Sequence, residues 1–235
     1  MTGMLTRYER LIAAGELRSD PDQRRAAERL DRLQKDLEAE SSGGLLSQLF
    51  RARKANPQGV YMWGGVGRGK SMLMDLFIET LGIDEKRRVH FHEFMLEVDR
   101  RIRERRESDP GDPTGKVARD IAQDVRCLAF DEMVVNNTAD AAIMARLFTA
   151  LIRDQGVTIV TTSNRPPRDL YKDGLNRSLF LPFIDLIEAD LDVVSLNGPT
   201  DYRMDRLGDI ATWHSPLGDD ATAQVREAFF RLTDY

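Results

Sequence analysis

The residues best suited to chemistry lie in one glycine-rich segment. Residues 64–71 have the sequence GGVGRGKS, which matches the phosphate-binding pattern G-x-x-x-x-G-K-[ST] at every fixed position. Glycines let such a loop turn tightly and direct its N–H groups toward phosphate oxygens. We expect Lys70 to contact the β- and γ-phosphates of ATP and Ser71 to bind Mg2+. The expected nucleotide-binding residues are Gly64, Gly65, Val66, Gly67, Arg68, Gly69, Lys70, Ser71 and Met72.

Two adjacent acids form the second candidate. Asp131 and Glu132 directly follow the apolar run Cys-Leu-Ala-Phe at residues 127–130. A buried strand that ends in acids places them at the carboxyl edge of an open α/β sheet, where ligands bind. We expect Asp131 to hold the Mg2+ and Glu132 to polarise the attacking water. The position of the acids, 131 − 70 = 61 residues beyond Lys70, favours this role over the alternative of a strand that ends in solvated acids.

Asn164 is the third candidate. It follows the β-branched run VTIVTTS at residues 157–163, which predicts a buried strand. An amide at the end of that strand is suited to hydrogen-bond the γ-phosphate or the attacking water. The alternative is a plain turn residue, because Asn before Arg-Pro-Pro also suits a loop.

The hydrophobic pattern supplies the elements that must position these groups. Strands are predicted at residues 59–63, 88–92, 127–130, 157–162 and 191–196, and helices at 70–81, 116–123 and 139–153, with a further helix that carries Phe94 and Ile102. This alternation predicts an α/β fold with a parallel sheet and helices on both faces. A strand before the glycine-rich loop and a helix after it argue against a chance match of the motif.

The first 55 residues are predicted to be helical. Asp20 can cap a helix that Pro21 begins, and Ala26, Leu30 and Leu33 recur at helical spacing. A short basic helix is expected near residues 45–50. The predicted organisation is an N-terminal helical segment (1–55), a P-loop ATPase core (56–203) and a C-terminal extension (204–235).

Composition narrows the class of protein. The chain has 34 Lys and Arg against 39 Asp and Glu, a net charge of −5 that argues against nucleic acid as the partner. Its one cysteine, Cys127, cannot form an internal disulfide, and we expect a buried apolar role in a reducing compartment. Neither a signal peptide nor a run of roughly 20 apolar residues is evident. The expected location is the cytoplasm.

Several short segments of the sequence together resemble those of a known family. The glycine-rich loop, the Asp-Glu strand and the strand that ends in Asn resemble AAA+ ATPases, and the detail resembles the AFG family, whose bacterial members are the ZapE-type cell-division ATPases. The segments that carry the resemblance are 61–75 (YMWGGVGRGKSMLMD), 89–95 (VHFHEFM), 162–166 (TSNRP), 169–171 (DLY), 174–177 (GLNR), 180–184 (FLPFI) and 201–203 (DYR). The similarity runs from about Tyr8 to the end of the chain.

The resemblance implies a P-loop NTPase fold of AAA+ type and an ATPase that acts mechanically on a protein partner. It also implies a homo-oligomeric ring in which a neighbouring subunit donates an arginine to the ATP. Arg177 suits that role best and Arg165 is the alternative, while a surface salt bridge is the plainer explanation of Arg177. The implied partner is the bacterial division machinery, and the implied location includes peripheral association at the inner membrane.

The sequence departs from the family pattern at four points. Met133 and Asn137 stand where the family favours phenylalanine and aspartate, and Asp99 stands where it favours histidine. The family also continues beyond residues 201–203 into a lid-like segment, whereas this sequence stops at Tyr235. We therefore expect a short form or a fragment in which nucleotide affinity and ring assembly are altered.

Three further features admit two interpretations each. His90 and His92, two apart on a predicted strand, would face the same side, and structural roles are favoured over a metal site. Phe94 and Met95 fit helix core better than a substrate-gripping pore loop. The five arginines between residues 100 and 106 fit a solvated helix face, or else a contact with an acidic partner or anionic lipid.

Two other functions compete with the ATPase hypothesis. One is a nucleotide-gated binding module with little turnover, which the short C-terminus favours. The other is a DNA-dependent ATPase of the helicase-loader kind, which shares the sheet and motifs but is disfavoured by the acidic net charge.

Overall fold

The computed structural model describes residues 3–41, 56–108, 111–135, 138–198, 218, 221–223 and 225–226. The strands are β1 (Gly59–Trp63), β2 (Lys86–His90), β3 (Cys127–Asp131), β4 (Thr158–Ser163) and β5 (Leu191–Ser195). The α-helices are α1 (Met4–Ala13), α2 (Pro21–Ser41), α4 (Lys70–Thr80), α5 (Phe91–Ser108), α6 (Pro113–Ala122), α7 (Thr138–Thr149) and α8 (Leu181–Asp190). The predicted basic helix near residues 45–50, Asn137 and most of the 204–235 extension lie outside the described residues.

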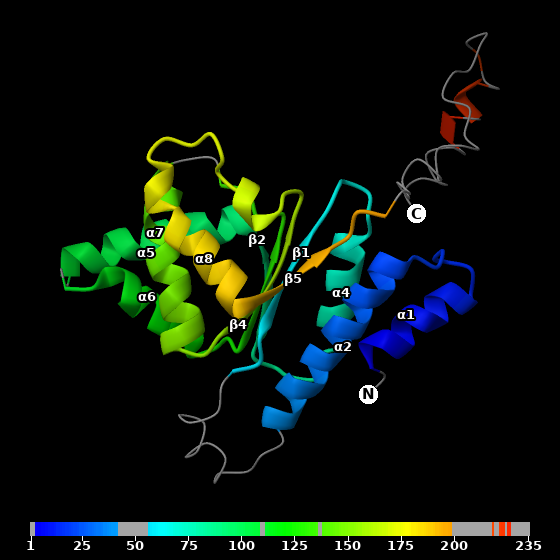
Figure 1. Cartoon of the computed structure of the whole chain (residues 1–235), viewed down its shortest axis with the longest axis horizontal. Helices are drawn as coiled ribbons and strands as arrows, with labels where there is room; N and C mark the ends of the chain where they lie inside the picture. The colour runs from blue at the N-terminus through cyan, green and yellow to red at the C-terminus, as the bar shows by residue number, and fades with distance from the viewer. Residues whose placement is uncertain are drawn as a thin grey trace.

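The five strands form one parallel sheet in the order β2-β3-β4-β1-β5 (Figure 1). The parallel arrangement brings the carboxyl ends of all strands to one edge, which is where an open α/β sheet binds ligands. The three predicted site segments follow β1, β3 and β4, and these are neighbours in the sheet. The expectation of a five-stranded parallel sheet is therefore confirmed.

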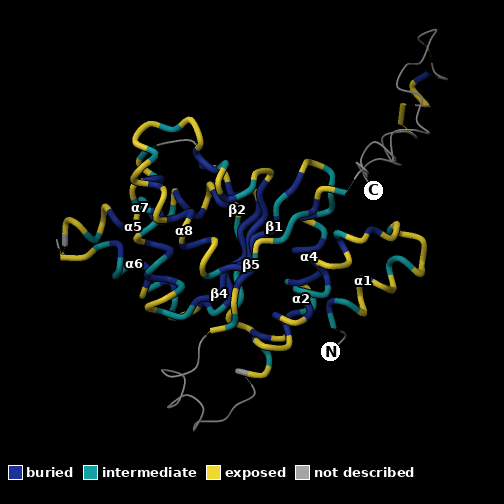
Figure 2. The backbone as a smooth tube through the Cα atoms, viewed as in Figure 1, coloured by how far each residue is buried: buried dark blue, intermediate teal, exposed yellow. Residues whose placement is uncertain are grey.

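Alternate side chains of the strands enter two different cores. One core joins α1, α2 and α4 to Val60, Met62, Cys127, Ala129 and Val160. The other joins the helices α5 to α8 to Tyr61, Leu128, Phe130 and Ile159. The period of two is that of a strand buried on both faces. Figure 1 shows these two helical layers on opposite sides of the sheet, and Figure 2 shows the strands as its most buried part.

The start of α2 fixes the N-terminal helices against the sheet. The backbone N–H groups of Asp22 and Gln23 donate to Asp20 Oδ1 at 2.7 and 2.9 Å, which confirms the predicted cap. Such a cap contributes about 1 kcal/mol to helix stability. Because α2 packs on α4, it brings the N-terminal segment beside the helix that begins at Lys70.

The prediction that His90 and His92 share one face of a strand is wrong. Strand β2 ends at His90, and α5 begins at Phe91 without an intervening loop, so His92 lies in the first turn of a helix. The two imidazoles therefore do not share a strand face. Both residues are exposed.

Two helical details were not predicted. The expected helix at 139–153 is α7 followed by a π-helical turn, Ala150–Asp154. Helix α8, which buries Phe183, Ile184, Leu186 and Ile187 on one face, was not among the predicted helices. No helix in the described part of the chain is long and apolar enough to cross a bilayer.

Cys127 fills the core between β3 and α4, as expected. It is fully buried, and burial raises the pKa of its thiol to about 12. Because the thiolate is the reactive form, we predict no reaction of native protein with Ellman's reagent at pH 8 and one reactive thiol per chain after denaturation in guanidinium. A rapid colour change with the folded protein would show that this core opens easily.

Candidate nucleotide-binding site

The glycine-rich loop leaves β1 in a conformation that its glycines permit. Gly69, which caps α4, has a φ of 80°, in the left-handed region that favours glycine. A Cβ on Gly64 would lie 2.1 Å from the backbone oxygen of Leu196, so a side chain cannot fit there. The sequence predicts a tightly folded phosphate-binding loop before the N-terminus of a helix, and the structure has such a loop between β1 and α4.

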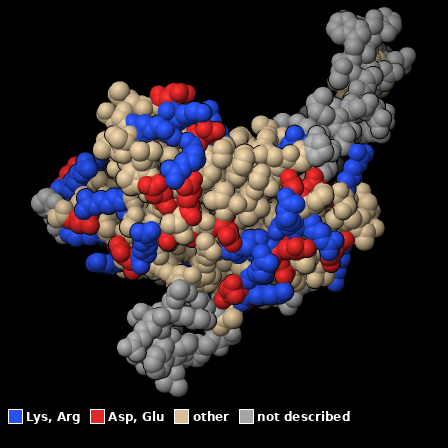
Figure 3. All heavy atoms as spheres, in the orientation of Figure 1, with Lys and Arg blue, Asp and Glu red and all other residues tan. Residues whose placement is uncertain are grey.

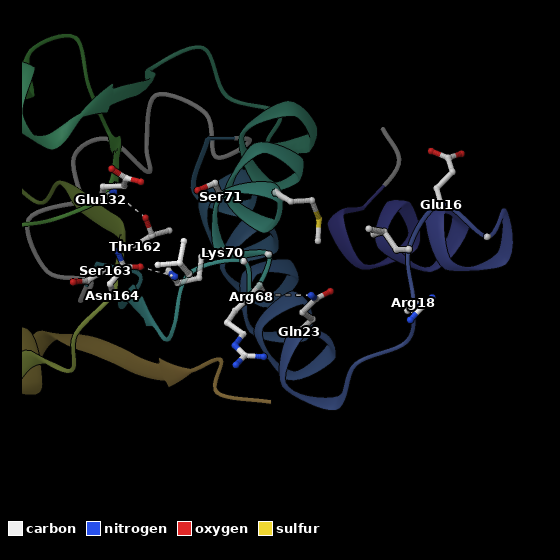
Figure 4. Close-up of a pocket in the computed structure, with 16 residues that line it drawn as sticks. Glu16, Arg18, Gln23, Arg68, Lys70, Ser71, Glu132, Thr162, Ser163 and Asn164 are labelled. Carbon is white, nitrogen blue, oxygen red and sulfur yellow. Dashed lines mark hydrogen bonds between the residues drawn. The ribbon is translucent and has the colours of Figure 1, made fainter. Parts of the chain in front are cut away.

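Lys70 connects this loop to β4. Its ammonium donates to the backbone oxygens of Gly64 and Gly65 at 2.9 and 2.7 Å and to Asn164 Oδ1 at 3.0 Å. The side chain is buried at the first residue of α4. Residues 94 positions apart in sequence therefore meet at the floor of one site (Figure 4).

Asp131 is held by three side chains. Its Oδ1 accepts hydrogen bonds from Thr162 Oγ1 at 2.7 Å and Ser71 Oγ at 3.1 Å, and its Oδ2 accepts one from Arg88 Nη2 at 2.8 Å. Burial by itself raises the pKa of the Asp131 carboxyl, but the hydrogen bonds from Thr162, Arg88 and Ser71 outweigh it and hold that pKa below its usual value. Asp131 is therefore an ionised carboxylate next to the Ser71 hydroxyl at neutral pH.

Glu132 leaves the strand by a change of backbone conformation. Its φ is 54°, which is uncommon for a residue with a side chain, and its N–H donates to Thr162 Oγ1 at 3.0 Å. This turn breaks the alternation of the strand and places an exposed carboxylate at the pocket. Backbone strain of this kind gathers at functional sites.

A pocket of about 540 Å³ lies over these groups. One wall is the glycine-rich loop and the start of α4, and a second is formed by Glu132, Thr162, Ser163 and Asn164. The third wall comes from the turn between α1 and α2, with Gly15, Glu16, Leu17 and Arg18, and from Gln23 on α2 (Figure 4). Gln23 Nε2 also donates to the backbone oxygen of Arg68 at 3.2 Å, so α2 supports the loop directly.

The comparisons with known proteins agree with this geometry. A sequence model of the family described as AFG1-like ATPase matches residues 2–235. The cell division protein ZapE of Escherichia coli K12 is 36% identical over 239 residues, covering 97% of this chain and 63% of ZapE. An uncharacterized protein of Schizosaccharomyces pombe is 33% identical over 256 residues, covering 95% of this chain and 56% of that protein.

The chain belongs to the AFG1-like ATPase family. It spans less than two thirds of the length of these two relatives. Among solved structures, AMPPCP-bound DnaA from Aquifex aeolicus matches with a TM-score of 0.53 and 14% identity, over 92% of this chain and 62% of DnaA. A second DnaA, bound to AMPPCP and single-stranded DNA, gives 0.51 and 15%, over 94% and 65%. At these identities the match shows the fold alone, which is that of a P-loop AAA+ protein.

In this AFG1-like ATPase, most predicted nucleotide-binding residues line the pocket. Gly64 and Gly65 are not among its lining residues but hold Lys70 through their carbonyl oxygens. The side chain of Arg68 extends away from Glu132 (Figure 4). The pocket-lining members of the predicted set are Val66, Gly67, Arg68, Gly69, Lys70, Ser71 and Met72. The turn at Gly15–Arg18 was not predicted, because no local motif marks a wall that only the packing of α1 and α2 creates.

Neither arginine proposed from the resemblance lies among the pocket residues of this chain. Arg177 begins the short 3-10 helix Arg177–Leu179, and its Nη2 donates to the backbone oxygen of Arg168 at 2.6 Å. Arg165 follows Asn164, and its backbone oxygen accepts a hydrogen bond from Tyr61 Oη at 2.8 Å. Their roles in a neighbouring subunit's site remain predictions.

The other candidates have structural explanations. Phe94 and Met95 of α5 are buried in the hydrophobic core between the helices and the sheet, which confirms that they serve as helix core. Four of the five arginines at residues 100–106 form ion pairs with Glu97, Asp99, Glu104 and Asp120. Figure 3 shows cationic and anionic side chains interspersed over one face of the molecule. Within the described residues, no group of three or more His, Cys, Asp or Glu is arranged to hold a metal.

We predict that Thr162→Val destabilises the fold by about 1–3 kcal/mol, because valine has the same shape but removes the hydrogen bonds to Asp131 and to the Glu132 N–H. Urea denaturation measures this. The matched control is Thr161→Val, whose hydroxyl makes only a 3.4 Å contact with a neighbouring backbone oxygen. Equal losses for the two variants would mean that the Thr162 hydroxyl does not hold the acids.

Proposed function

We propose that this chain binds ATP with Mg2+ and hydrolyses it. The observation that carries the proposal is that Lys70, Ser71 and Asn164 line one pocket and that Asp131 is hydrogen-bonded to Ser71. The three segments involved are those that the sequence singles out for this chemistry. A chance glycine-rich turn would not be followed by two correctly placed partners on neighbouring strands. Membership of the AFG1-like ATPase family supports the same chemistry.

The proposed binding mode places the triphosphate along the glycine-rich loop. Backbone N–H groups and the N-terminus of α4 face the phosphate oxygens, and Lys70 contacts the β- and γ-phosphates. Ser71 Oγ and Asp131 Oδ1, 3.1 Å apart, are the oxygen ligands that Mg2+ prefers alongside phosphate oxygens, so the residues fit the ion. When bound, Mg2+ supplies positive charge that neutralises the phosphates.

Glu132 is the proposed base and Asn164 the group that orients the water or the γ-phosphate. Glu132 suits proton transfer because its carboxylate is exposed at the pocket while its backbone is fixed by Thr162. Asn164 already hydrogen-bonds the ammonium that would contact the phosphates. We therefore assign both side chains to the region of the γ-phosphate.

A second copy of the chain completes the proposed site. Arg177 lies on an exposed 3-10 segment between Leu175 and Leu179, which are 72% and 55% exposed. Exposed apolar side chains around a cation are suited to pack against another subunit and to deliver the guanidinium into its site. The proposed assembly is therefore a homo-oligomeric ring.

The proposed biological role is mechanical work on a protein partner in bacterial cell division. It rests on the similarity to E. coli ZapE, whose name records cell division, and on the general coupling of nucleotide state to subunit contacts. The corresponding location is the cytoplasm, with peripheral association at the inner membrane. Nucleic acid is not proposed as a partner, because the net charge is −5.

We predict that Glu132→Gln binds ATP but hydrolyses it at least about 100-fold more slowly, because the amide cannot accept a proton. Lys70→Ala should instead weaken ATP binding by roughly 100-fold through loss of charged hydrogen bonds to phosphate. Fluorescent-nucleotide titration and a phosphate-release assay separate the two effects. Glu79→Gln, an exposed acid on the same helix as Lys70, is the control.

Three outcomes are informative. Steady turnover by Glu132→Gln at the wild-type rate would refute its assignment as the base. Wild-type protein that binds ATP without releasing phosphate would instead favour a nucleotide-gated binding module. Turnover that rises only with single-stranded DNA would favour the DNA-dependent alternative.

Arg177→Ala is predicted to lower kcat by about 10³-fold, the usual cost of losing an arginine supplied to a phosphoryl transfer. Because the arginine acts on a neighbour, mixing this variant with Lys70→Ala should restore activity: one protein supplies an intact pocket and the other an intact arginine. Arg100→Ala, which removes an exposed ion pair with Glu104, controls for charge. Failure of the mixture to recover, with a comparable loss in Arg165→Ala, would move the role to Arg165.

A further inference from the structure

Arg88 joins the glycine-rich-loop helix to the acidic strand. It lies on the edge strand β2, where its register partner on β3 is Ala129, so it faces the α4 side of the sheet. One end of its guanidinium, Nη1, forms an ion pair with Asp75 on α4. The other end, Nη2, donates to Asp131 Oδ2 at 2.8 Å.

The two oxygens of Asp131 therefore have separate partners. Oδ1 faces Ser71 and Thr162, whereas Oδ2 is occupied by Arg88. Rotation of the carboxylate would break hydrogen bonds at both ends. Arg88 thus leaves Oδ1 as the oxygen that faces Ser71, which lines the pocket.

Arg88 also forms ion pairs with two acids at once, Asp75 and Asp131. Asp75 is one helical turn beyond Ser71 on the same face of α4, so it flanks the position where Asp131 meets that helix. Divalent cations of the Mg2+ type bind through one or two carboxylates and water. A guanidinium hydrogen-bonded between such acids repels a divalent cation and occupies one oxygen of each acid.

The neighbouring cations of β2 are engaged elsewhere. Lys86 Nζ donates to the backbone oxygens of Ile78 and Leu81, both at 2.6 Å, at the end of α4. Arg87 points to the other face of the sheet and pairs with Glu97 on α5. Arg88 is thus the cation of this strand that acts on Asp131.

We propose that Arg88 is a positioning residue that makes divalent-metal binding depend on nucleotide. The inference rests on the proposed function and deepens it by naming how that site is regulated. Without nucleotide, the charge of Arg88 keeps Asp75 and Asp131 from taking up a cation. The phosphates of ATP add negative charge that outweighs the repulsion between Arg88 and the metal ion. Asp131 Oδ1 already faces Ser71.

The test measures Mn2+ binding to the full chain by electron paramagnetic resonance, without nucleotide and with AMPPCP. Arg88→Met removes the charge and keeps the apolar stem. We expect its nucleotide-free affinity for Mn2+ to rise by at least about tenfold over wild type, so that AMPPCP increases affinity far less than it does in wild type. Arg87→Met, the same change on the adjacent residue and the opposite face, should leave both affinities unchanged.

Two further variants isolate the cause. Arg88→Lys keeps the charge and should keep nucleotide-free Mn2+ binding weak. Adding Asp75→Asn to Arg88→Met should return the nucleotide-free affinity toward wild type, because it removes one of the two carboxylates that Arg88 contacts. Circular dichroism verifies folding, and Arg88→Gln serves as the neutral variant should Arg88→Met not fold.

A folded neutral variant whose nucleotide-free Mn2+ affinity equals that of wild type overturns the inference. So does wild-type protein that binds Mn2+ equally well with and without AMPPCP while binding AMPPCP itself. Wild-type protein that binds no AMPPCP contradicts the proposed function instead. The Mn2+ affinities of Arg88→Met and Arg87→Met without nucleotide can be compared whether or not the protein binds AMPPCP.

Discussion

The hydroxyl of Thr162 is the contact on which the acidic side of the site depends. It donates to Asp131 Oδ1 and accepts from the Glu132 N–H, so one side chain on β4 fixes two acids at the end of β3. This is possible because β3 and β4 are parallel neighbours whose carboxyl ends coincide. A buried hydroxyl that both donates and accepts costs little, whereas the Asp131 carboxylate or the Glu132 N–H left without it would carry a desolvation penalty of about 1–3 kcal/mol. The same strand then supplies Asn164 to Lys70.

The two halves of the site are held from different sides of the sheet edge. The helix that carries Lys70 and Ser71 is supported by α2, through Gln23 and the packing of the two helices. The acids are supported within the sheet by Thr162 and from the edge by Arg88. A movement of α4 relative to β2 and β3 would therefore change both the Ser71–Asp131 and the Asp75–Arg88 contacts.

The sequence predicted the parts of the site that depend on local pattern. The glycine-rich loop, the Asp131–Glu132 strand end and Asn164 could be placed because each follows a strand, and parallel strands share an edge. The turn at Gly15–Arg18 could not, since only the tertiary packing of α1 and α2 brings it there. His92 was misplaced because α5 follows β2 without a loop, and element boundaries carry the weakest signal. The partners of Arg88 depend on strand register and a long side chain, and neither is visible in a single sequence.

The edge strand β2 shows how a run of cations can serve structure and chemistry together. Lys86, Arg87 and Arg88 would be counted from composition as a solvated basic patch, yet each has a different partner. Lys86 closes the carbonyl end of α4, Arg87 holds α5 on the opposite face, and Arg88 reaches the acids of the site. The alternation of a strand assigns these directions, because successive side chains point to opposite faces. Charged side chains on an edge strand also oppose pairing with another sheet, so the same three residues protect the edge and connect the helical layers to the site.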